Sequence, residues 1–265
     1  MHAAFFDYDK DGDLDMILLN HSPIRFNDLD EAKLTYLLHQ PDSLTGIKLF
    51  RNTNNFFEEV TQAAGLLNSR LNYNLGVSVT DVNNDGWPDL YVSNDYSAPD
   101  YLYINNKNGA YTDSIRSMLS KTSHFSMGND VADINNDGWA DIFTLDMLPE
   151  DNRRQKLLLA SDNYEIFDMR VRIGLHAQYM INMLHINNGN GSFSEVAQLQ
   201  GVSNTDWSWA PLIADFDNDG WKDLYVTNGF LRDFTNLDFL KFMGNKLRDL
   251  QGKVTKNTLL ELVKS

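Results

Sequence analysis

The sequence contains no cysteine, so it has no disulfide bonds, no thiolate metal ligands and no cysteine nucleophile. Long apolar runs are also missing, because no stretch approaches the roughly 18 apolar residues that a membrane helix requires. The opening residues, MHAAFFDYDK, have neither the basic start nor the apolar core of a secretion signal. We therefore expect no membrane insertion by this chain, and the sequence shows no targeting segment.

Basic residues are few relative to acidic ones. The 265 residues include 22 Lys and Arg against 37 Asp and Glu, which gives a net charge of -15. This charge opposes nucleic-acid phosphate and anionic lipid, but it suits bound cations. We therefore expect no nucleic-acid partner and look first for a cation site.

One nine-residue pattern occurs four times: DYDKDGDLD from Asp7, DVNNDGWPD from Asp81, DINNDGWAD from Asp133 and DFDNDGWKD from Asp215. Each copy follows an apolar stretch and precedes an alternating or apolar one such as MILL or LYVSN. Short segments of this kind are typical of strands. Each copy is therefore predicted to be a loop that joins two strands.

A second pattern follows three of these loops: LFRNTNNFFEEV from Leu49, LYINNKNGAYTDS from Leu102 and LHINNGNGSFSEV from Leu184. Each copy predicts a hairpin, and Asn108-Gly109 and Asn190-Gly191 are predicted to supply the positive φ angles of its turn. The first copy lacks that glycine. Loop and hairpin together give about four strands per unit, which is the content of one propeller blade. The sequence thus predicts an all-β fold, a partial β-propeller of about four blades with helical insertions.

The spacing between the patterns locates the insertions. In the first and third units, more residues separate the loop from its hairpin than in the second unit. The extra residues lie in 20–48 and 146–181, so both insertions are expected to fall between second and third strands. That connection lies on the face opposite the loops, which we expect to be the ligand surface. We assign residues 1–229 to blades and residues 230–265 to a helical segment, interpreted as a truncated insertion of the fourth blade. The open array favours a segment of a longer chain over an intact four-blade protein.

The loop pattern supplies oxygen ligands only. Side chains at positions 1, 3, 5 and 9 and the carbonyl at position 7 form a cage for a hard cation, with glycine at position 6. Calcium suits such a cage better than magnesium or zinc. The predicted ligands are Asp7, Asp9, Asp11, Asp13 and Asp15; Asp81, Asn83, Asp85, Trp87 and Asp89; Asp133, Asn135, Asp137, Trp139 and Asp141; and Asp215, Asp217, Asp219, Trp221 and Asp223. We therefore expect about four Ca²⁺ ions.

An EF-hand and a simple polar turn fit the loop pattern less well than this cage. An EF-hand needs an acidic ligand at position 12 and flanking helices, but position 12 is Leu18, Val92, Thr144 or Val226 and the flanks are strand-like. Simple polar turns would also contain Asp, Asn and Gly. Four copies in one register, with carboxylates that repel one another without a cation, favour metal binding. Extracellular calcium modules bind with dissociation constants of about 0.1 to 1 mM, which favours an extracytoplasmic location, secreted or at the cell surface.

The loop DxDxDGxxD, the strands LGVSVTD and MGNDVAD, and the hairpin LxxNNxNGxFxEV resemble the FG-GAP or VCBS repeat family, which includes the integrin α-type propellers. The resemblance covers most of residues 3–229, and the third and fourth units are similar to bacterial surface proteins of this type. It implies a seven-bladed ring, calcium in the loops, and secretion or surface anchoring with adhesion or ligand binding. The four loops and irregular insertions of this chain depart from that pattern.

The remaining candidate residues are expected to have structural roles. We expect the side chains of Trp87, Trp139, Trp221, Trp207 and Trp209 to fill the core between blades. Three histidines fall in or beside the insertions (His21, His39 and His176), and a basic run in the third unit is expected to be a solvated helix face (Arg153, Arg154 and Lys156).

Three functions remain open. The first is a non-catalytic calcium-binding propeller that binds an extracellular protein or glycan. The alternative is a glycan-active hydrolase or lyase whose acids come from the third insertion: Glu150, Asp151, Asp162, Glu165 or His176. The last is a structural repeat with no ligand. Convergence of two insertion acids in a pocket would favour the enzyme.

Overall fold

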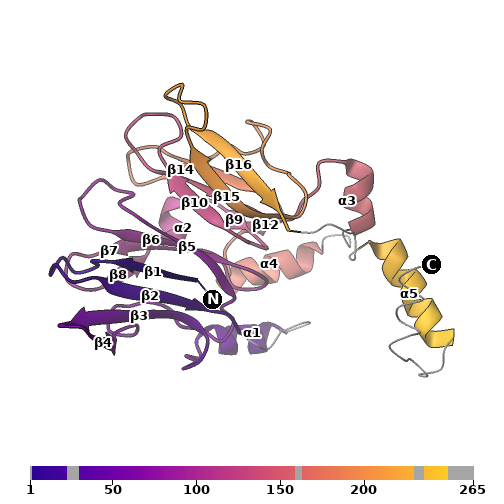
Figure 1. Ribbon diagram of the computed structural model, residues 1–265. Helices are drawn as coiled ribbons and strands as arrows, with labels where there is room; N and C mark the ends of the chain where they lie inside the picture. Colours follow the sequence, from indigo (N-terminus) through magenta and orange to yellow (C-terminus); the bar gives the residue numbers. More distant parts are fainter. Residues whose placement is uncertain (1, 23–29, 159–162, 230–235, 250–265) are drawn as a thin grey trace.

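The computed structural model describes residues 2–22, 30–158, 163–229 and 236–249. These residues form three four-stranded antiparallel sheets, an antiparallel strand pair and several helices. In Figure 1 the sheets follow one another from the indigo N-terminal sheet upward to the orange pair β15–β16. The prediction of a mostly β fold with helical insertions is confirmed at this level.

Each sheet follows the chain in simple order. The first unit contains β1 (His2–Phe6), β2 (Asp15–Asn20), β3 (Gly46–Thr53) and β4 (Phe56–Glu59). The second contains β5 (Asn74–Thr80), β6 (Asp89–Asn94), β7 (Tyr101–Asn105) and β8 (Tyr111–Asp113). The third contains β10 (Asn129–Ala132), β11 (Asp141–Thr144), β13 (Met183–Asn187) and β14 (Phe193–Glu195).

The fourth unit has two described strands, β15 (Ser208–Ala214) and β16 (Asp223–Asn228). The helices are α1 (Glu31–Leu38), α2 (Ile115–Met118), α3 (Asn152–Leu158), α4 (Tyr164–Arg172) and α5 (Leu237–Asp249). A short parallel pair, β9 (Thr122–Ser123) with β12 (Gln178–Tyr179), joins the insertion of the third unit to the segment before β10. The helix-like sequence around residue 240 is confirmed as α5, whereas the helix-like sequence from residue 258 lies outside the described residues.

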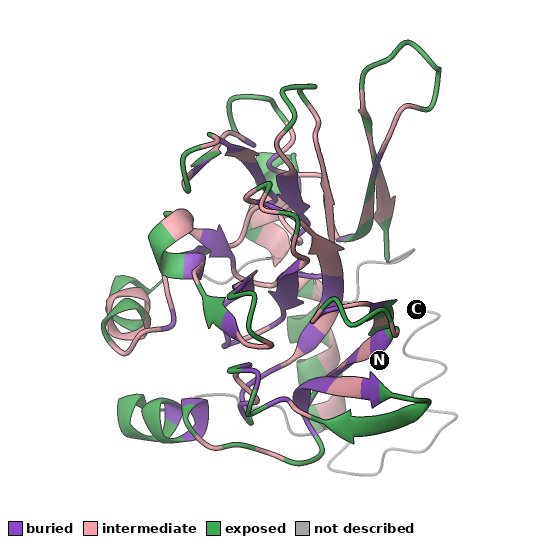
Figure 2. Cartoon of the chain, turned by 90° about the vertical axis from the view of Figure 1, so that its left-hand side faces the viewer, coloured by how far each residue is buried: buried purple, intermediate pink, exposed green. Residues whose placement is uncertain are grey.

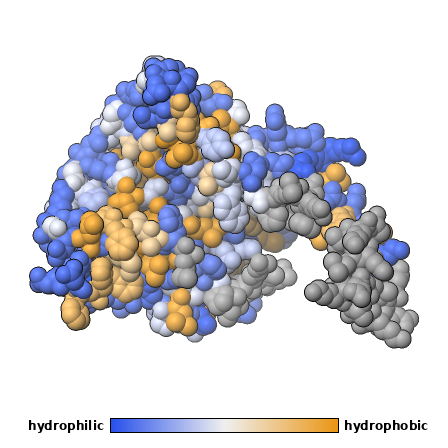
Figure 3. Space-filling model, viewed as in Figure 1, coloured by the Kyte–Doolittle hydropathy of each residue, from blue (hydrophilic) through white to orange (hydrophobic). Residues whose placement is uncertain are grey.

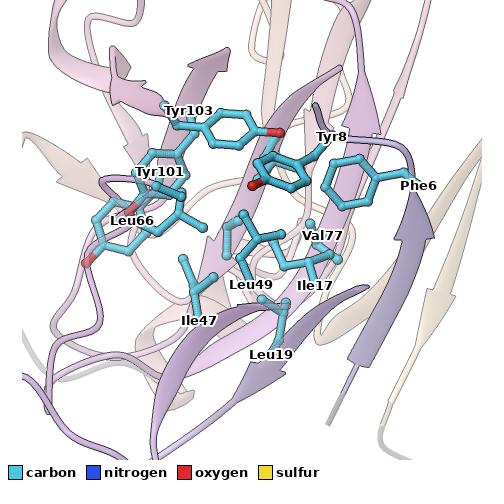
Figure 4. Close-up of a cluster of buried hydrophobic side chains, with 14 residues drawn as sticks. Phe6, Tyr8, Ile17, Leu19, Ile47, Leu49, Leu66, Val77, Tyr101 and Tyr103 are labelled. Atoms are coloured by element: carbon cyan, nitrogen blue, oxygen red, sulfur yellow. The ribbon is translucent and has the colours of Figure 1, made fainter. Parts of the chain in front are cut away.

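The first strand of each unit lies beside the first strand of the next. Contacts link β1 with β5, β5 with β10, and β10 with β15. Side chains from neighbouring units meet between them, and Figure 4 shows the largest such cluster, in which Ile17 and Leu49 of the first unit lie near Tyr101 and Tyr103 of the second. The sheets are therefore packed face to face in a row, with the core between units (Figure 2).

The hairpin turns differ from the prediction. The positive φ angles in the second hairpin belong to Lys107 and Gly109, so the expected contribution of Asn108 is wrong. Asn108 instead accepts a hydrogen bond from Ala110 N–H at 3.1 Å, which closes a longer loop. The third hairpin repeats this pattern with Gly189 and Gly191 positive and with the side chain of Asn190 accepting from Ser192 N–H.

The first hairpin, which lacks the glycine, has the tighter turn. Thr53 pairs with Phe56, so only two residues connect the strands. Both of them, Asn54 and Asn55, have positive φ, at 54° and 67°. Asparagine tolerates this left-handed conformation better than most residues, and it therefore replaces the missing glycine.

The helices of the two insertions pack together. Leu34, Leu37 and Leu38 of α1 share a buried cluster with Leu175, against which Met169 of α4 also packs. Leu71 and Ala98 of the second unit complete the cluster. Arg172 of α4 also lies 3.8 Å from Glu31 of α1. The two insertions thus meet across the unit that separates them, to the right of the sheets in Figure 1.

Two expectations about packing residues are wrong. Arg154 is not part of a solvated helix face, because its guanidinium makes two hydrogen bonds to Asp206, at 2.6 and 3.1 Å. Trp209 and Trp221 are 49% and 57% exposed and do not fill a core. Both tryptophans belong to the fourth unit, where no described third or fourth strand covers the sheet.

Candidate metal sites

The backbone of each repeated loop wraps around the aspartate at position 1. In the first loop, Asp11 N–H and Gly12 N–H each donate to the Asp7 carboxylate at 3.1 Å. The same two bonds occur in the other loops, at Asp81, Asp133 and Asp215, with distances of 2.6 to 3.1 Å. Glycine at position 6 has φ between 85° and 95° in all four loops, which favours glycine at that position.

The aspartate at position 9 ties the loop to the sheet. Asp15 accepts from Tyr8 N–H at 3.0 Å and from Asn52 N–H of the hairpin at 2.8 Å. The second and third units repeat both bonds, with Asp89 and Asp141 as acceptors. In the fourth unit Asp223 accepts from Phe216 N–H at 3.0 Å. The sequence repeat therefore corresponds to one repeated hydrogen-bond network.

Two loops bring three carboxylates together. Oxygen atoms of Asp7, Asp9 and Asp15 lie within 4.8 Å of one another, and so do those of Asp215, Asp217 and Asp223. These are positions 1, 3 and 9 of the predicted cage. The aspartates at position 5 fall outside both groups, and each accepts a hydrogen bond from the N–H of position 7: Asp13, Trp87, Trp139 and Trp221. Two possible cation sites are thus present.

The second and third loops keep the backbone network but carry less charge. Asn83 and Asn135 occupy position 3, and each accepts a hydrogen bond from the N–H of position 5. In the second loop, Lys107 lies 3.3 Å from Asp85. Burial disfavours the charged form of Asp85, but the N–H of Trp87 and the ammonium of Lys107 outweigh it, so the pKa is lowered. These loops therefore have a smaller excess of negative charge to offset.

The first loop fits a bound cation. Burial, with the neighbouring charge of Asp11, raises the pKa of Asp9, and Asp9 Oδ1 is buried without a hydrogen-bond partner among the described residues. Burial also raises the pKa of Asp15 and, in the second unit, raises that of Asp89 to about 6. A divalent cation would compensate such buried carboxylates and supply the missing partner of Asp9.

Aromatic side chains line the face of the first three units that is opposite the loops. The rings of His21 and Tyr73 are 4.6 Å apart, those of Tyr73 and Tyr96 are 5.0 Å apart, and Phe125 lies 6.3 Å beyond Tyr96. We call His21, Tyr73, Tyr96, Phe125 and His124 the aromatic row. It runs from the end of β2, past the end of β6, to the segment that precedes β10.

The row ends at a neutral histidine. Burial and the neighbouring Arg170 lower the pKa of His124 to about 3, and Arg170 Nη1 lies 2.5 Å from His124 Nε2. Because arginine can only donate, Nε2 accepts. Tyr96 has a positive φ of 67°, which is uncommon for an aromatic residue and which orients its ring between Tyr73 and Phe125. Sequence reasoning missed this row, since its members come from different segments.

The acids of the alternative enzyme hypothesis do not form a group among the described residues. Asp151 accepts from Arg154 N–H at the start of α3, and Glu165 lies in the first turn of α4. Glu150 is exposed, His176 is half-buried with a positive φ, and Asp162 lies outside the described residues. His39 ends α1. The described acids that gather in threes are those of the loops.

Two fully buried aspartates were also missed. Asp100 accepts from Tyr91 Oη, Ser126 Oγ and Asn94 N–H, and burial raises its pKa to about 7. Asp146 accepts from Ser123 Oγ and from three backbone N–H groups, and burial raises its pKa to about 6. Both connect a unit to the segment that leads into β10. Each follows a second strand, but so do many exposed acids, so no pattern in the sequence distinguishes them.

The geometry defines a class of repeat protein in which antiparallel sheets are joined to acidic, glycine-containing loops. Comparison with protein families specifies the class further: a family model described as FG-GAP-like repeat matches residues 7–92, 81–144 and 158–226. The chain belongs to the FG-GAP-like repeat family. The resemblance inferred from the sequence is therefore confirmed.

Other comparisons are more distant. No curated protein matches the sequence. Among solved structures, the chain is similar to an Agrocybe aegerita lectin described as recognising non-reducing terminal N-acetylglucosamine, with 16% sequence identity and a TM-score of 0.38. The match covers 84% of this chain and 45% of the lectin chain, so this chain spans less than half of the lectin. No described helix is long and apolar enough to cross a membrane.

Proposed function

We propose that this chain is a calcium-stabilised, propeller-type module that binds a glycan or protein ligand outside the cytoplasm and performs no catalysis. The observation that carries the proposal is the hydrogen-bond network common to the four loops, which in two of them gathers three carboxylates within 4.8 Å. Oxygen ligands from carboxylates suit calcium, and family membership agrees with that choice.

Calcium in these loops would stabilise the fold. At a dissociation constant of about 0.1 to 1 mM, millimolar calcium adds roughly 1 kcal/mol per site. Four sites would add an amount close to the lower end of a domain's total stability, about 5 kcal/mol. Cytosolic calcium is too low to fill sites of this affinity, and this supports the extracytoplasmic location.

The calcium proposal is tested by thermal unfolding with stepwise calcium, with EDTA, and with magnesium as the control, while calorimetry counts the bound ions. We expect a calcium-specific rise of the midpoint and about four sites. Failure of calcium to change the midpoint would sink the metal assignment and leave the loops as polar turns. Binding at the first and fourth loops alone would support the assignment only where three carboxylates meet.

The proposed ligand surface is the aromatic row. Half-buried rings such as Tyr73, Tyr96 and Phe125 present apolar faces, and sugar rings stack on faces of this kind while their hydroxyls bond to polar neighbours. The separation of the row from the loops supports a binding role that does not consume the metal sites.

The binding proposal is tested on an immobilised glycan panel with the wild-type chain and with Phe125→Ala. The matched control is Phe56→Ala, because Phe56 is 83% exposed but lies on β4, away from the row. We expect Phe125→Ala to weaken binding at least tenfold and Phe56→Ala to leave it unchanged. Equal binding by both variants would remove the row from the proposal, and hydrolysis of a panel glycan would contradict the non-catalytic assignment.

A further inference from the structure

Arg170, at the end of the aromatic row, is a cation without an acidic partner among the described residues. Hydrophilic side chains cover much of the face in Figure 3, and acidic residues outnumber basic ones by 37 to 22. Several described arginines accordingly pair with carboxylates at 2.6 to 3.4 Å: Arg51 with Glu58, Arg70 with Asp42, Arg154 with Asp206, and Arg172 with Asp168. The remaining described arginines are exposed to water, whereas Arg170 is half-buried.

The part of Arg170 that lacks a partner is the Nε–Nη2 edge of its guanidinium. Nη1 donates to His124 Nε2 at 2.5 Å, whereas Nε is buried without a partner and no described residue accepts from Nη2. The N–H groups of Nε and Nη2 point the same way, so together they can hold both oxygens of one carboxylate. Arg154 uses this same edge, because its Nε and Nη2 donate to the two oxygens of Asp206 at 2.6 and 3.1 Å.

The guanidinium of Arg170 lies one side chain away from the ring of Phe125. The ring centroids of His124 and Phe125 are 4.1 Å apart, and the ring of Tyr96 lies 6.3 Å from that of Phe125. The buried carboxylate of Asp146 accepts from the backbone N–H of both His124 and Phe125, and Met169 packs α4 against the cluster that includes α1. Rings and guanidinium are thus held in place before a ligand arrives, which lowers the entropic cost of binding.

We propose that the ligand of the aromatic row is an acidic saccharide whose carboxylate binds the Nε–Nη2 edge of Arg170. This inference rests on the glycan-binding role proposed for the row, and it adds the chemical class of the ligand. A uronic acid has both required parts in one sugar residue: an apolar ring face that stacks on an aromatic side chain, and a planar carboxylate beside it. Phe125 binds the ring face, and Arg170 selects for the charge.

A purely structural role for Arg170 accounts for less of what is seen. The bond to His124 needs only one of its N–H groups, and a neutral donor would be sufficient for it. His124 does not offset the charge of the guanidinium, because burial and Arg170 itself lower the pKa of His124 to about 3 and keep the ring neutral. A half-buried charge without a counter-charge costs free energy in the unbound chain. Binding of an anion explains why an arginine is found here.

The net charge of -15 does not prevent such a ligand from binding. Charges separated by more than about 8 Å are largely screened at physiological ionic strength, so the groups near the row decide. Three acids near the row in the sequence already have partners: Asp95 accepts from Tyr96 N–H, Asp146 accepts from His124 N–H, and Asp168 pairs with Arg172. Among the described residues, Arg170 therefore remains the unpaired charge at this end of the row.

The proposal is tested on immobilised short oligosaccharides of galacturonic, glucuronic or guluronic acid, each beside its neutral methyl ester, with the calcium-loaded full chain. The two members of a pair have the same rings and differ in charge. We expect the wild-type chain to bind at least one acid at least tenfold more tightly than its ester. Arg170→Gln should lose this preference and keep its affinity for the ester. Equal loss of affinity for acid and ester would assign Arg170 a structural role and overturn the proposal.

Arg172→Gln is the matched control, because Arg172 lies on the same helix, pairs with Asp168, and changes the net charge by the same amount when it is replaced. We expect this variant to keep the preference for the acid. Arg170→Lys keeps the positive charge but not the fork of two N–H groups, so it should retain only part of the preference. Thermal unfolding checks that each variant folds.

The outcomes separate this inference from the proposed function. Binding of the esters that Phe125→Ala abolishes, without any preference for the acids, would overturn the inference and leave the row as a glycan site. Acid binding that neither Arg170→Gln nor Phe125→Ala weakens would also overturn it, because calcium in the loops would then hold the carboxylate. Tighter binding of a sulfated glycan than of every uronate would contradict the assignment to a carboxylate. A wild-type chain that binds no member of the panel would count against both proposals.

Discussion

The first and fourth loops have the same carboxylate group and the same backbone bonds, yet their surroundings differ. Asp15 is fully buried under the hairpin of its own sheet, whereas Asp223 is exposed on a described sheet of two strands. The shape of each loop therefore comes from its own nine residues. The contribution of each loop residue to stability depends on the strands and units that bury it.

The largest expected difference in stability lies at position 11, two residues after the aspartate at position 9. Tyr91→Ala should lower the free energy of unfolding by about 3 to 5 kcal/mol, because it removes a fully buried ring. Tyr225→Ala, the same substitution at the same position of the fourth unit, should cost less than about 1 kcal/mol in the monomer. Urea denaturation at low protein concentration measures both. Similar losses would show that the fourth unit is covered in solution.

A smaller contrast is expected at position 9. Asp15→Ala leaves the buried N–H groups of Tyr8 and Asn52 without their acceptor and should cost about 2 to 3 kcal/mol in metal-free buffer. Asp223→Ala removes one described bond at an exposed site and should cost about 1 kcal/mol or less. Chemical denaturation in EDTA compares the two variants. Equal losses of unfolding free energy would show that burial under the hairpin does not increase the contribution of Asp15.

The effect of burial extends to Asp100, which is far from both loops in the sequence. Its pKa is about 7 in the folded chain and near 3.8 when exposed, so the folded state keeps a proton that the unfolded state loses. This contribution to stability is complete below about pH 4 and is lost as pH rises toward 7, with a slope of at most about 1.4 kcal/mol per pH unit.

Replacement of Asp100 should therefore flatten the pH dependence. Thermal midpoints of Asp100→Asn, measured in EDTA from pH 4.5 to 8, should fall less than those of the wild type. Asp238→Asn changes an exposed carboxylate on α5 and should keep the wild-type slope. A wild-type slope in Asp100→Asn would assign the pH dependence to other groups, such as Asp146.

The smallest effect concerns charge at position 3. Asn83→Asp gives the second loop the three carboxylates of the first and fourth, which should lower stability by about 0.5 kcal/mol without calcium and increase the stabilisation by calcium. Asp217→Asn should do the reverse in the fourth loop. Calorimetric titration measures calcium binding by the two variants. Unchanged binding in both would mean that position 3 does not bind the ion.

The sequence predicts those parts of the fold that are determined locally and repeated. Four loops in one register specify their flanking strands, and the distances from Asp7 to Leu49 and from Asp133 to Leu184 locate the insertions between second and third strands. Local pattern also predicts α5. These features need only neighbouring residues, so one sequence is sufficient to find them.

Features that depend on distant residues were not predictable. The burial of Asp100 requires Ser126 from another segment, and the pairing of Arg154 with Asp206 joins residues on either side of the third hairpin. Trp139 and Trp221 have the same sequence context but different exposure, because no described hairpin covers the second of them. The aromatic row has the same origin, since it forms only when the units are packed.

The cluster shared by α1 and α4 has a consequence for how the chain unfolds. In a simple repeat array each unit interacts only with its immediate neighbours, so unfolding can proceed one unit at a time from an end. Here Leu37, in the insertion of the first unit, and Leu175, in the insertion of the third unit, share one apolar cluster with residues of the second unit. Pulling on the N-terminus should therefore release three units in a single force step, whereas pulling on the C-terminus should first peel away β15 and β16 alone.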